Sequence, residues 1–149
     1  MSRCPRLMKR LISTRCGART MFIDSSVVVE ILIDGDRANE LLGRMAESRS
    51  ICTGPTVIYE SATVLATRLG RQPEETKLLV QRFVERFEIS VLPASYEVAS
   101  AAIDAFARYG KGRHPAKLNF GDCFSYAGAR QSGLPLLYVG GDFARTDLA

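Results

Sequence analysis

Four carboxylates stand in the sequence where they could hold a metal ion. Asp24 directly follows a short apolar run, and Asp142 follows another one through two glycines. Glu60 and Asp122 stand on early turns of segments with helical spacing. Residues just past the carboxyl ends of strands in an open α/β sheet converge on one crevice. There the four acids would repel one another unless a cation lay between them, and ions such as Mg²⁺ prefer carboxylate and phosphate oxygens. The pattern therefore indicates metal-assisted phosphodiester chemistry.

Each acidic position also has a purely structural explanation. Asp24 precedes two serines at a helix start, where Asp and Ser commonly cap the helix. Asp122 is expected at a third helical position, where an acid gains typically 0.3 to about 1 kcal/mol from the helix dipole. Glu60 could be a helix-edge residue that reaches water, and Asp142 a turn aspartate. Ser26, two residues after Asp24, adds a hydroxyl that suits a metal-bound water or a phosphate oxygen. Joint placement at strand ends favours a shared site over four separate caps.

The order of elements predicts a parallel sheet. Short apolar runs alternate with longer segments that carry apolar residues at three and four spacing, which is typical of βαβ units. Strands are predicted over 21–23, 50–53, 89–92 and 136–139. Helices are predicted over 26–33, 38–47, 55–69, 74–87, 96–109 and 120–131. Pro55 suits the first position of its helix and Gly70 the position after its end. The predicted fold class is α/β, with helices covering both faces of the sheet.

Composition predicts one domain, over residues 21–149. The chain has 149 residues, 46% of them hydrophobic, which is enough for one core of ordinary size. Its apolar runs are far shorter than the roughly 20 residues of a membrane-spanning helix, so membrane insertion is not expected. Cys4, Cys16, Cys52 and Cys123 are scattered and accompanied by one histidine, His114, which does not suit a zinc site. They are interpreted as reduced thiols of a cytoplasmic protein, buried in the last two cases.

Basic residues are concentrated in a leader, residues 1–20. Six of the 20 basic side chains and no acid lie there, so the remainder has 14 basic against 16 acidic side chains, a net charge of −2. The leader could be a nucleic-acid-binding arm or an organelle-type transit peptide. It could also be an upstream extension of the reading frame that contributes nothing to the fold, because Met21 stands directly before the first strand.

Four motifs carry a family resemblance that covers nearly the whole domain. They are MFIDSSVVVEIL, PTVIYESATVL, HPAKLNFGDCFSYAGAR and PLLYVGGDFARTDL. In this order the chain resembles the PIN-domain ribonucleases and, within them, the VapC-type toxins of bacterial toxin–antitoxin systems. The resemblance implies a three-layer α/β/α sandwich with a short, mainly parallel sheet. It also implies an endoribonuclease that depends on Mg²⁺ or Mn²⁺, forms a homodimer and is inhibited by a cognate antitoxin.

The same resemblance assigns the site. The acidic residues of the family fall on Asp24, Glu60, Asp122 and Asp142, and its strand-end hydroxyl falls on Ser26. The three aspartates would hold one or two metal ions, with Glu60 binding directly or through water. A metal there would activate a water for in-line attack on the scissile phosphate.

Other positions are weighed beside this site. Lys111, Arg113 and Lys117 lie in a predicted surface loop, where they either contact the RNA backbone or are simply solvated. His114 in that loop is interpreted as a loop residue rather than a catalyst. Gly128 departs from the family pattern and is expected to loosen its helix by up to about 1 kcal/mol. Asp104 is expected to face solvent, and Asp147 is a candidate outer ligand.

Two other classes of function stay open from the residues alone. A haloacid-dehalogenase-like phosphohydrolase also begins with a strand-end aspartate, but it needs a second aspartate at the position of Ser26. A non-catalytic module that binds RNA or an antitoxin would act stoichiometrically. Multiple turnover of RNA cleavage separates that module from an enzyme.

Overall fold

A four-stranded parallel sheet forms the centre of the molecule. The computed structural model describes residues 20–148. The strands are β1 (Thr20–Ile23), β2 (Ser50–Thr53), β3 (Ser90–Val91) and β4 (Leu136–Leu137). Their order across the sheet is β3-β2-β1-β4, and every pairing is parallel. The first strand therefore lies inside the sheet, and its carboxyl end is flanked on both sides.

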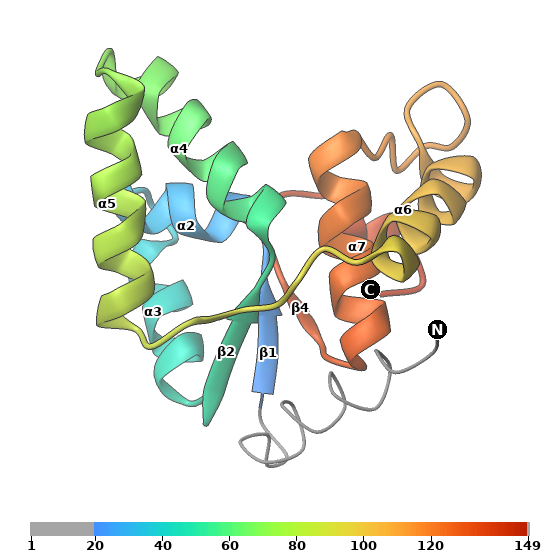
Figure 1. The fold of residues 1–149 in the computed structure, drawn as a ribbon, viewed down its shortest axis with the longest axis horizontal. Helices are drawn as coiled ribbons and strands as arrows, with labels where there is room; N and C mark the ends of the chain where they lie inside the picture. Colours follow the sequence, from blue (N-terminus) through green and yellow to red (C-terminus); the bar gives the residue numbers. More distant parts are fainter. Residues whose placement is uncertain (1–19, 149) are drawn as a thin grey trace.

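Helices cover the sheet in two layers. They are α2 (Ser25–Leu32), α3 (Ala38–Ala46), α4 (Pro55–Leu69), α5 (Pro73–Arg86), α6 (Tyr96–Tyr109) and α7 (Phe120–Ser132), followed by the short 3₁₀ helix η1 (Phe143–Arg145). Helices α2 to α5 lie on one side of the strands and α6 and α7 on the other (Figure 1). Within the layers α4 packs on α5 and α2, and α6 packs on α7. The predicted three-layer α/β/α class is confirmed.

The sequence places most element boundaries within one residue. The bounds of β2, α4 and α6 agree with the prediction. Helix α4 begins with Pro55, where the missing N–H costs nothing, and its C-cap is Gly70 in the left-handed region at φ 60°. Asn119 caps α7, as the prediction for Asp122 at the third position requires. Local capping chemistry therefore determines these ends.

The two short strands differ from the prediction. Strand β4 ends at Leu137 rather than at residue 139, because the backbone N–H of Val139 donates to the hydroxyl of Ser26 instead of a strand partner. Strand β3 contains only two residues. Strand β1 begins at Thr20, one residue early, where it pairs with Ser50 on β2. The rest of the predicted leader lies outside the described residues.

Close packing explains the glycine in α7. Phe22 on β1 is 1% exposed and lies in the core beneath this helix. A Cβ atom at Gly128 would stand 2.6 Å from Cζ of the Phe22 ring, closer than packed atoms allow. The glycine that was expected only to loosen the helix therefore makes room for a core aromatic ring. Cys52 and Cys123 are buried, as predicted, whereas Cys4 and Cys16 lie outside the described residues.

None of the helices within residues 20–148 has the length and hydrophobicity needed to cross a membrane.

Candidate active site

Asp24 is held rigidly at the carboxyl end of β1. It is the N-cap of α2 and only 3% exposed. Its Oδ2 atom accepts hydrogen bonds from the backbone N–H of Ser26 at 3.0 Å and from the Ser26 hydroxyl at 2.6 Å. Its Oδ1 atom accepts from the hydroxyl of Ser125 on α7 at 2.6 Å. Both carboxylate oxygens are thus oriented by groups from two different helices.

Ser26 links Asp24 to the chain that leads toward Asp142. Its Oγ atom donates to Asp24 and accepts from the backbone N–H of Val139 at 3.0 Å. The hydroxyl therefore lies inside the predicted site, and within the structure it positions the carboxylate and the segment after β4. This contact is also the reason that β4 is short.

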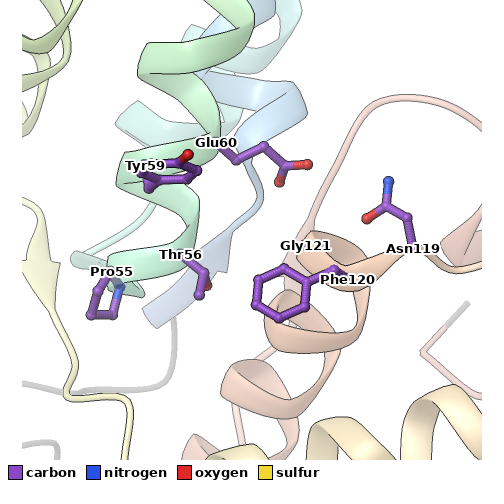
Figure 2. Close-up of a pocket in the computed structure, with 7 residues that line it drawn as sticks. All are labelled: Pro55, Thr56, Tyr59, Glu60, Asn119, Phe120 and Gly121. Atoms are coloured by element: carbon purple, nitrogen blue, oxygen red, sulfur yellow. The ribbon is translucent and has the colours of Figure 1, made fainter.

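Glu60 reaches from α4 across to the start of α7. Its Oε2 atom accepts a hydrogen bond from the Ser25 hydroxyl at 2.8 Å. The carboxylate points toward α7 in Figure 2, and a Cβ atom at Gly121 would lie 2.3 Å from Oε2. Burial raises the pKa of Glu60, the Ser25 hydrogen bond opposes this, and the charge of Asp24 adds to it. The absence of a side chain at Gly121 is what allows this approach.

Asp122 completes the first turn of α7. Its Oδ2 atom accepts from the backbone N–H of Asn119 at 2.9 Å, and the Asn119 side-chain oxygen accepts from the Asp122 N–H at 2.9 Å. This is a capping box, so the structural explanation from the sequence is realised here. Burial raises the pKa of Asp122 to about 6, although the Asn119 hydrogen bond opposes the change. The charges of Asp24, Asp142 and Glu60 raise this pKa further, so these three acids lie within electrostatic reach of Asp122.

Asp142 approaches from the segment after β4. It is exposed, precedes η1, and follows Gly140, which has a φ of 99° that favours glycine. Its charge acts on Asp122. Asp104 is exposed on α6, as predicted. Asp147, the candidate outer ligand, pairs with the guanidinium of Arg130.

The acids suit a hydrated divalent ion better than a fully protein-coordinated one. Within residues 20–148, no three His, Cys, Asp or Glu side chains already surround a single point closely enough to chelate an ion. In the same residues, none of the ion pairs joins a Lys or Arg to any of the four acids. Mg²⁺ usually keeps several waters and binds through one or two carboxylates together with substrate phosphates. The donor set therefore fits such an ion.

Two hydroxyl groups that contact the acids were not predicted from the sequence. Ser125 is fully buried and donates to Asp24, and Ser25 donates to Glu60. The sequence does contain a signal for the first, because residues three apart on a helix lie on the same face and Ser125 follows Asp122 by three. It contains no comparable signal for Ser25, whose neighbour Ser26 is the better match to the pattern.

The loop between α6 and α7 keeps its histidine in a structural role. The ring of His114 packs edge-on against Tyr109 with centroids 5.1 Å apart. Its Nδ1 atom accepts from the backbone N–H of Ala116 at 3.1 Å. The interpretation of His114 as a loop residue is confirmed. The cations of this loop are exposed: Lys111, Arg113 and Lys117.

The fold and site define an α/β/α domain in which Asp24, Glu60, Asp122 and Asp142 form an acidic crevice near the carboxyl ends of the strands. The PIN domain family model matches residues 21–148. A VapC ribonuclease of Rhizobium meliloti is 39% identical over 140 residues, covering 85% of this chain and 98% of that protein. A ribonuclease VapC of Mycolicibacterium smegmatis is 42% identical over 130 residues, covering 87% and 98%. The chain therefore belongs to the PIN domain family and, within it, to the VapC ribonucleases.

Solved structures show the same fold. Mycobacterium tuberculosis VapC20, described as a sarcin-ricin loop cleaving toxin, aligns with a TM-score of 0.67 at 19% identity, covering 83% of this chain and 92% of that one. A toxin–antitoxin complex from Klebsiella pneumoniae aligns with a TM-score of 0.60 at 19% identity, covering 86% and 93%. The predicted family is confirmed, and it excludes the haloacid-dehalogenase-like alternative.

Proposed function

We propose that this protein cleaves RNA with divalent cations held by Asp24, Glu60, Asp122 and Asp142. As a VapC ribonuclease it is the endoribonuclease toxin of a toxin–antitoxin pair. The observation that carries the proposed site is the convergence of these acids. The hydroxyl of Ser25, next to Asp24, donates to Glu60 at 2.8 Å, and burial together with the charges of Asp24, Asp142 and Glu60 raises the pKa of Asp122. Uncompensated negative charge of this kind is relieved by a cation.

The three aspartates are the proposed direct ligands of one or two Mg²⁺ or Mn²⁺ ions. Glu60 binds directly or through a water. When bound, such an ion lowers the pKa of a coordinated water and neutralises charge on the scissile phosphate. Ser26 and Ser125 hold the Asp24 carboxylate in one orientation, and Ser25 does the same for Glu60.

Proton transfer falls to the carboxylates. His114, the one histidine of the chain, packs on Tyr109 in the loop before α7. Burial raises the pKa of Glu60 toward the range in which a carboxylate accepts a proton more readily. We assign Glu60 as the group that accepts a proton from the attacking water.

RNA, a cognate antitoxin and a second copy of the chain are the proposed partners. The exposed cations of the loop before α7 contact RNA phosphates, so binding weakens steeply with salt. The Klebsiella pneumoniae complex supports a protein antitoxin. The cytoplasm, where cellular RNA substrates are found, is its proposed location.

Cleavage assays test the enzymatic proposal. Purified protein is incubated with total cellular RNA and Mg²⁺ or Mn²⁺, and the new RNA ends are sequenced. Discrete ends that accumulate beyond one cut per protein molecule are expected, and EDTA abolishes them. Cleavage that stops below one cut per molecule would instead support the non-catalytic module. Co-expression with the protein encoded beside it is expected to relieve growth inhibition.

The homodimer has a separate test. An apolar hollow of about 430 Å³ lies between α6 and α7, and Ile103 on its rim is 68% exposed. Exposed apolar surface of this kind marks protein contacts. Light scattering is expected to give a dimer mass for the unaltered chain and a monomer mass for Ile103→Glu. A monomer in both cases would contradict the dimer.

A further inference from the structure

A second hollow lies between α4 and α7, beside the acidic crevice. It encloses about 490 Å³ and opens to solvent (Figure 2). Its lining consists of Pro55, Thr56, Tyr59, Glu60, Asn119, Phe120 and Gly121. Most of this surface is carbon, and the Glu60 carboxylate and the Asn119 amide stand at one end of the hollow (Figure 2). The two aromatic rings are its largest side chains.

Both aromatic rings are largely exposed to solvent. Tyr59 and Phe120 are each 73% exposed. Phe120 is supported from behind by Phe124, with ring centroids 4.9 Å apart. Exposed aromatic rings on opposite walls of a hollow gain little for the stability of the free protein, because most of their surface stays in water. They therefore suit a ligand with flat faces.

The hollow and the acidic crevice share a wall. Glu60 lines the hollow and also accepts a hydrogen bond from Ser25 beside Asp24. Gly121 lines the hollow and lies under the Glu60 carboxylate. Whatever occupies the hollow is therefore adjacent to the proposed metal ligands.

The chemistry of the lining selects the occupant. No Lys or Arg is among the lining residues, and the Glu60 carboxylate faces the hollow, so a phosphate group is disfavoured there. Nucleobases carry no net charge, have flat π faces and bear amino groups. Asn119 uses its side-chain oxygen in the capping box, and within residues 20–148 its amide nitrogen has no hydrogen-bond partner. That amide can donate to a base edge, and Glu60 can accept from an amino group.

We propose that the hollow between Tyr59 and Phe120 binds one unpaired RNA base next to the scissile phosphate. This inference rests on the proposed function, because it concerns the substrate of the same site. Stacking of single-stranded bases on aromatic rings is tolerant of base identity, whereas hydrogen bonds to the base edge select among bases. The rings therefore provide affinity, and Asn119 and Glu60 provide preference.

The test couples protein variants to chemically altered RNA. A short single-stranded oligoribonucleotide that the unaltered protein cuts once is prepared in versions with an abasic ribose at successive positions. One abasic position beside the cut is expected to lower kcat/KM roughly tenfold, as removal of one stacked base does. Tyr59→Ala is expected to lose a similar factor on intact RNA and to lose almost nothing more on that abasic RNA. Phe120→Ala is expected to behave in the same way and, because Phe120 also lines the hollow between α6 and α7, to keep the dimer mass of the unaltered chain in light scattering. Tyr59→Phe keeps the ring and retains cleavage.

Tyr96→Ala is the matched control, because Tyr96 is 84% exposed on α6 and does not line the hollow. It is expected to cleave every RNA like the unaltered chain. A 2-aminopurine base at the same nucleotide gives a direct readout, since its fluorescence changes on stacking. With Ca²⁺ supplied to slow cleavage, the change is expected for the unaltered protein and is lost in Tyr59→Ala.

Three outcomes would overturn the inference. One is that a ring variant loses as large a factor in kcat/KM on the abasic RNA as it does on intact RNA, which would show that the rings and the base act independently. A second is that Tyr59→Ala cleaves normally but escapes inhibition by the antitoxin, which assigns the hollow to a protein segment. A third is an unchanged 2-aminopurine signal. Failure of the unaltered protein to cleave any RNA would sink the proposed function instead, and the fluorescence would still report on the hollow.

Discussion

Two regions of this molecule hold their carboxylates with opposite kinds of partner. At the C-terminal edge, Asp147 accepts a hydrogen bond from the Tyr126 hydroxyl at 2.7 Å and pairs with Arg130, while Arg108 lies 3.5 Å away. The Tyr126 hydrogen bond and the two guanidinium charges lower the pKa of Asp147. Here the protein supplies its own cations.

At the acidic crevice the partners are hydroxyl and amide groups. Asp24 is held by Ser26 and Ser125, and the pKa of Asp122 is raised to about 6, first by burial and then by its acidic neighbours. Hydroxyl groups orient a carboxylate without cancelling its charge. A carboxylate paired with guanidinium groups is neutralised within the protein. Carboxylates that are oriented but not neutralised are available to a cation from solution.

The largest expected effect separates the two regions directly. Asp24→Asn preserves the hydrogen-bonding shape but removes a charge of the proposed metal site, so RNA cleavage should fall at least about 100-fold and growth inhibition should disappear. Asp147→Asn is the matched control. It should cleave normally and lose less than about 1 kcal/mol of stability, since both arginine partners are partly exposed and an amide oxygen can still accept from the Tyr126 hydroxyl. Equal loss of cleavage in both folded variants would show that the two regions do not differ in their importance for cleavage.

A smaller effect is expected from Ser125→Ala. The substitution leaves the buried Oδ1 atom of Asp24 without its donor, so the apparent affinity for Mn²⁺ should fall about 10- to 100-fold while the fold persists. Titration of cleavage against Mn²⁺ measures it. Ser132→Ala on the same helix is the control, because that hydroxyl bonds only to carbonyls of its own helix. An unchanged Mn²⁺ dependence would show that Ser125 does not position Asp24.

Gly121→Ala should displace Glu60 without unfolding the protein. The new methyl group would overlap the Glu60 carboxylate, so cleavage should fall several-fold, up to about tenfold. Gly43→Ala in α3 provides the control, since nothing lies within 4 Å of its new methyl group. Gly43→Ala should cleave normally and gain up to about 1 kcal/mol in helix stability. Normal cleavage by Gly121→Ala would remove Glu60 from the site.

The smallest effect is on stability in the absence of metal. Burial raises the pKa of Asp122 in the folded state to about 6, well above the ordinary value of an aspartate. This group therefore favours folding most at low pH, where it is protonated, and the contribution is lost as pH rises through about 6. Asp122→Asn in EDTA should therefore be more stable than the unaltered chain at pH 8, by about 1 to 2 kcal/mol after allowance for partial exposure. The two should converge near pH 4.

Urea unfolding across this pH range measures the difference, with the exposed Asp104→Asn as control. Divalent metal should stabilise the unaltered chain more than Asp122→Asn. Identical pH profiles for the unaltered chain and Asp122→Asn would show that the crevice is already neutralised.

Much of this arrangement was readable from the sequence. Pro55, Gly70 and Asn119 determine helix ends through local chemistry, so boundaries at those positions follow from residue type. The convergence of Asp24 and Asp122 follows from the general geometry of parallel sheets. Family motifs then assigned four acids whose individual signals are weak.

The remaining features depend on long-range contacts. The end of β4 is decided by a hydrogen bond from Val139 to Ser26, which are 113 residues apart. The role of Ser125 depends on a partner 101 residues away, and Asp147 meets Arg130 only when α7 and the C-terminal segment are packed together. No local pattern specifies such pairs, which explains why the pairing of Asp147 with Arg130 was not predicted from the sequence.

The position of β1 has a consequence for the durability of the site. Asp24 follows a strand hydrogen-bonded on both sides, whereas Asp142 follows a two-residue strand at the sheet edge. Local opening starts where few backbone bonds must break, so amide exchange with deuterium should be slowest around Phe22 and much faster after Leu137. Local unfolding of that edge would displace the Asp142 carboxylate from the proposed site and abolish RNA cleavage while the centre of the sheet stays folded.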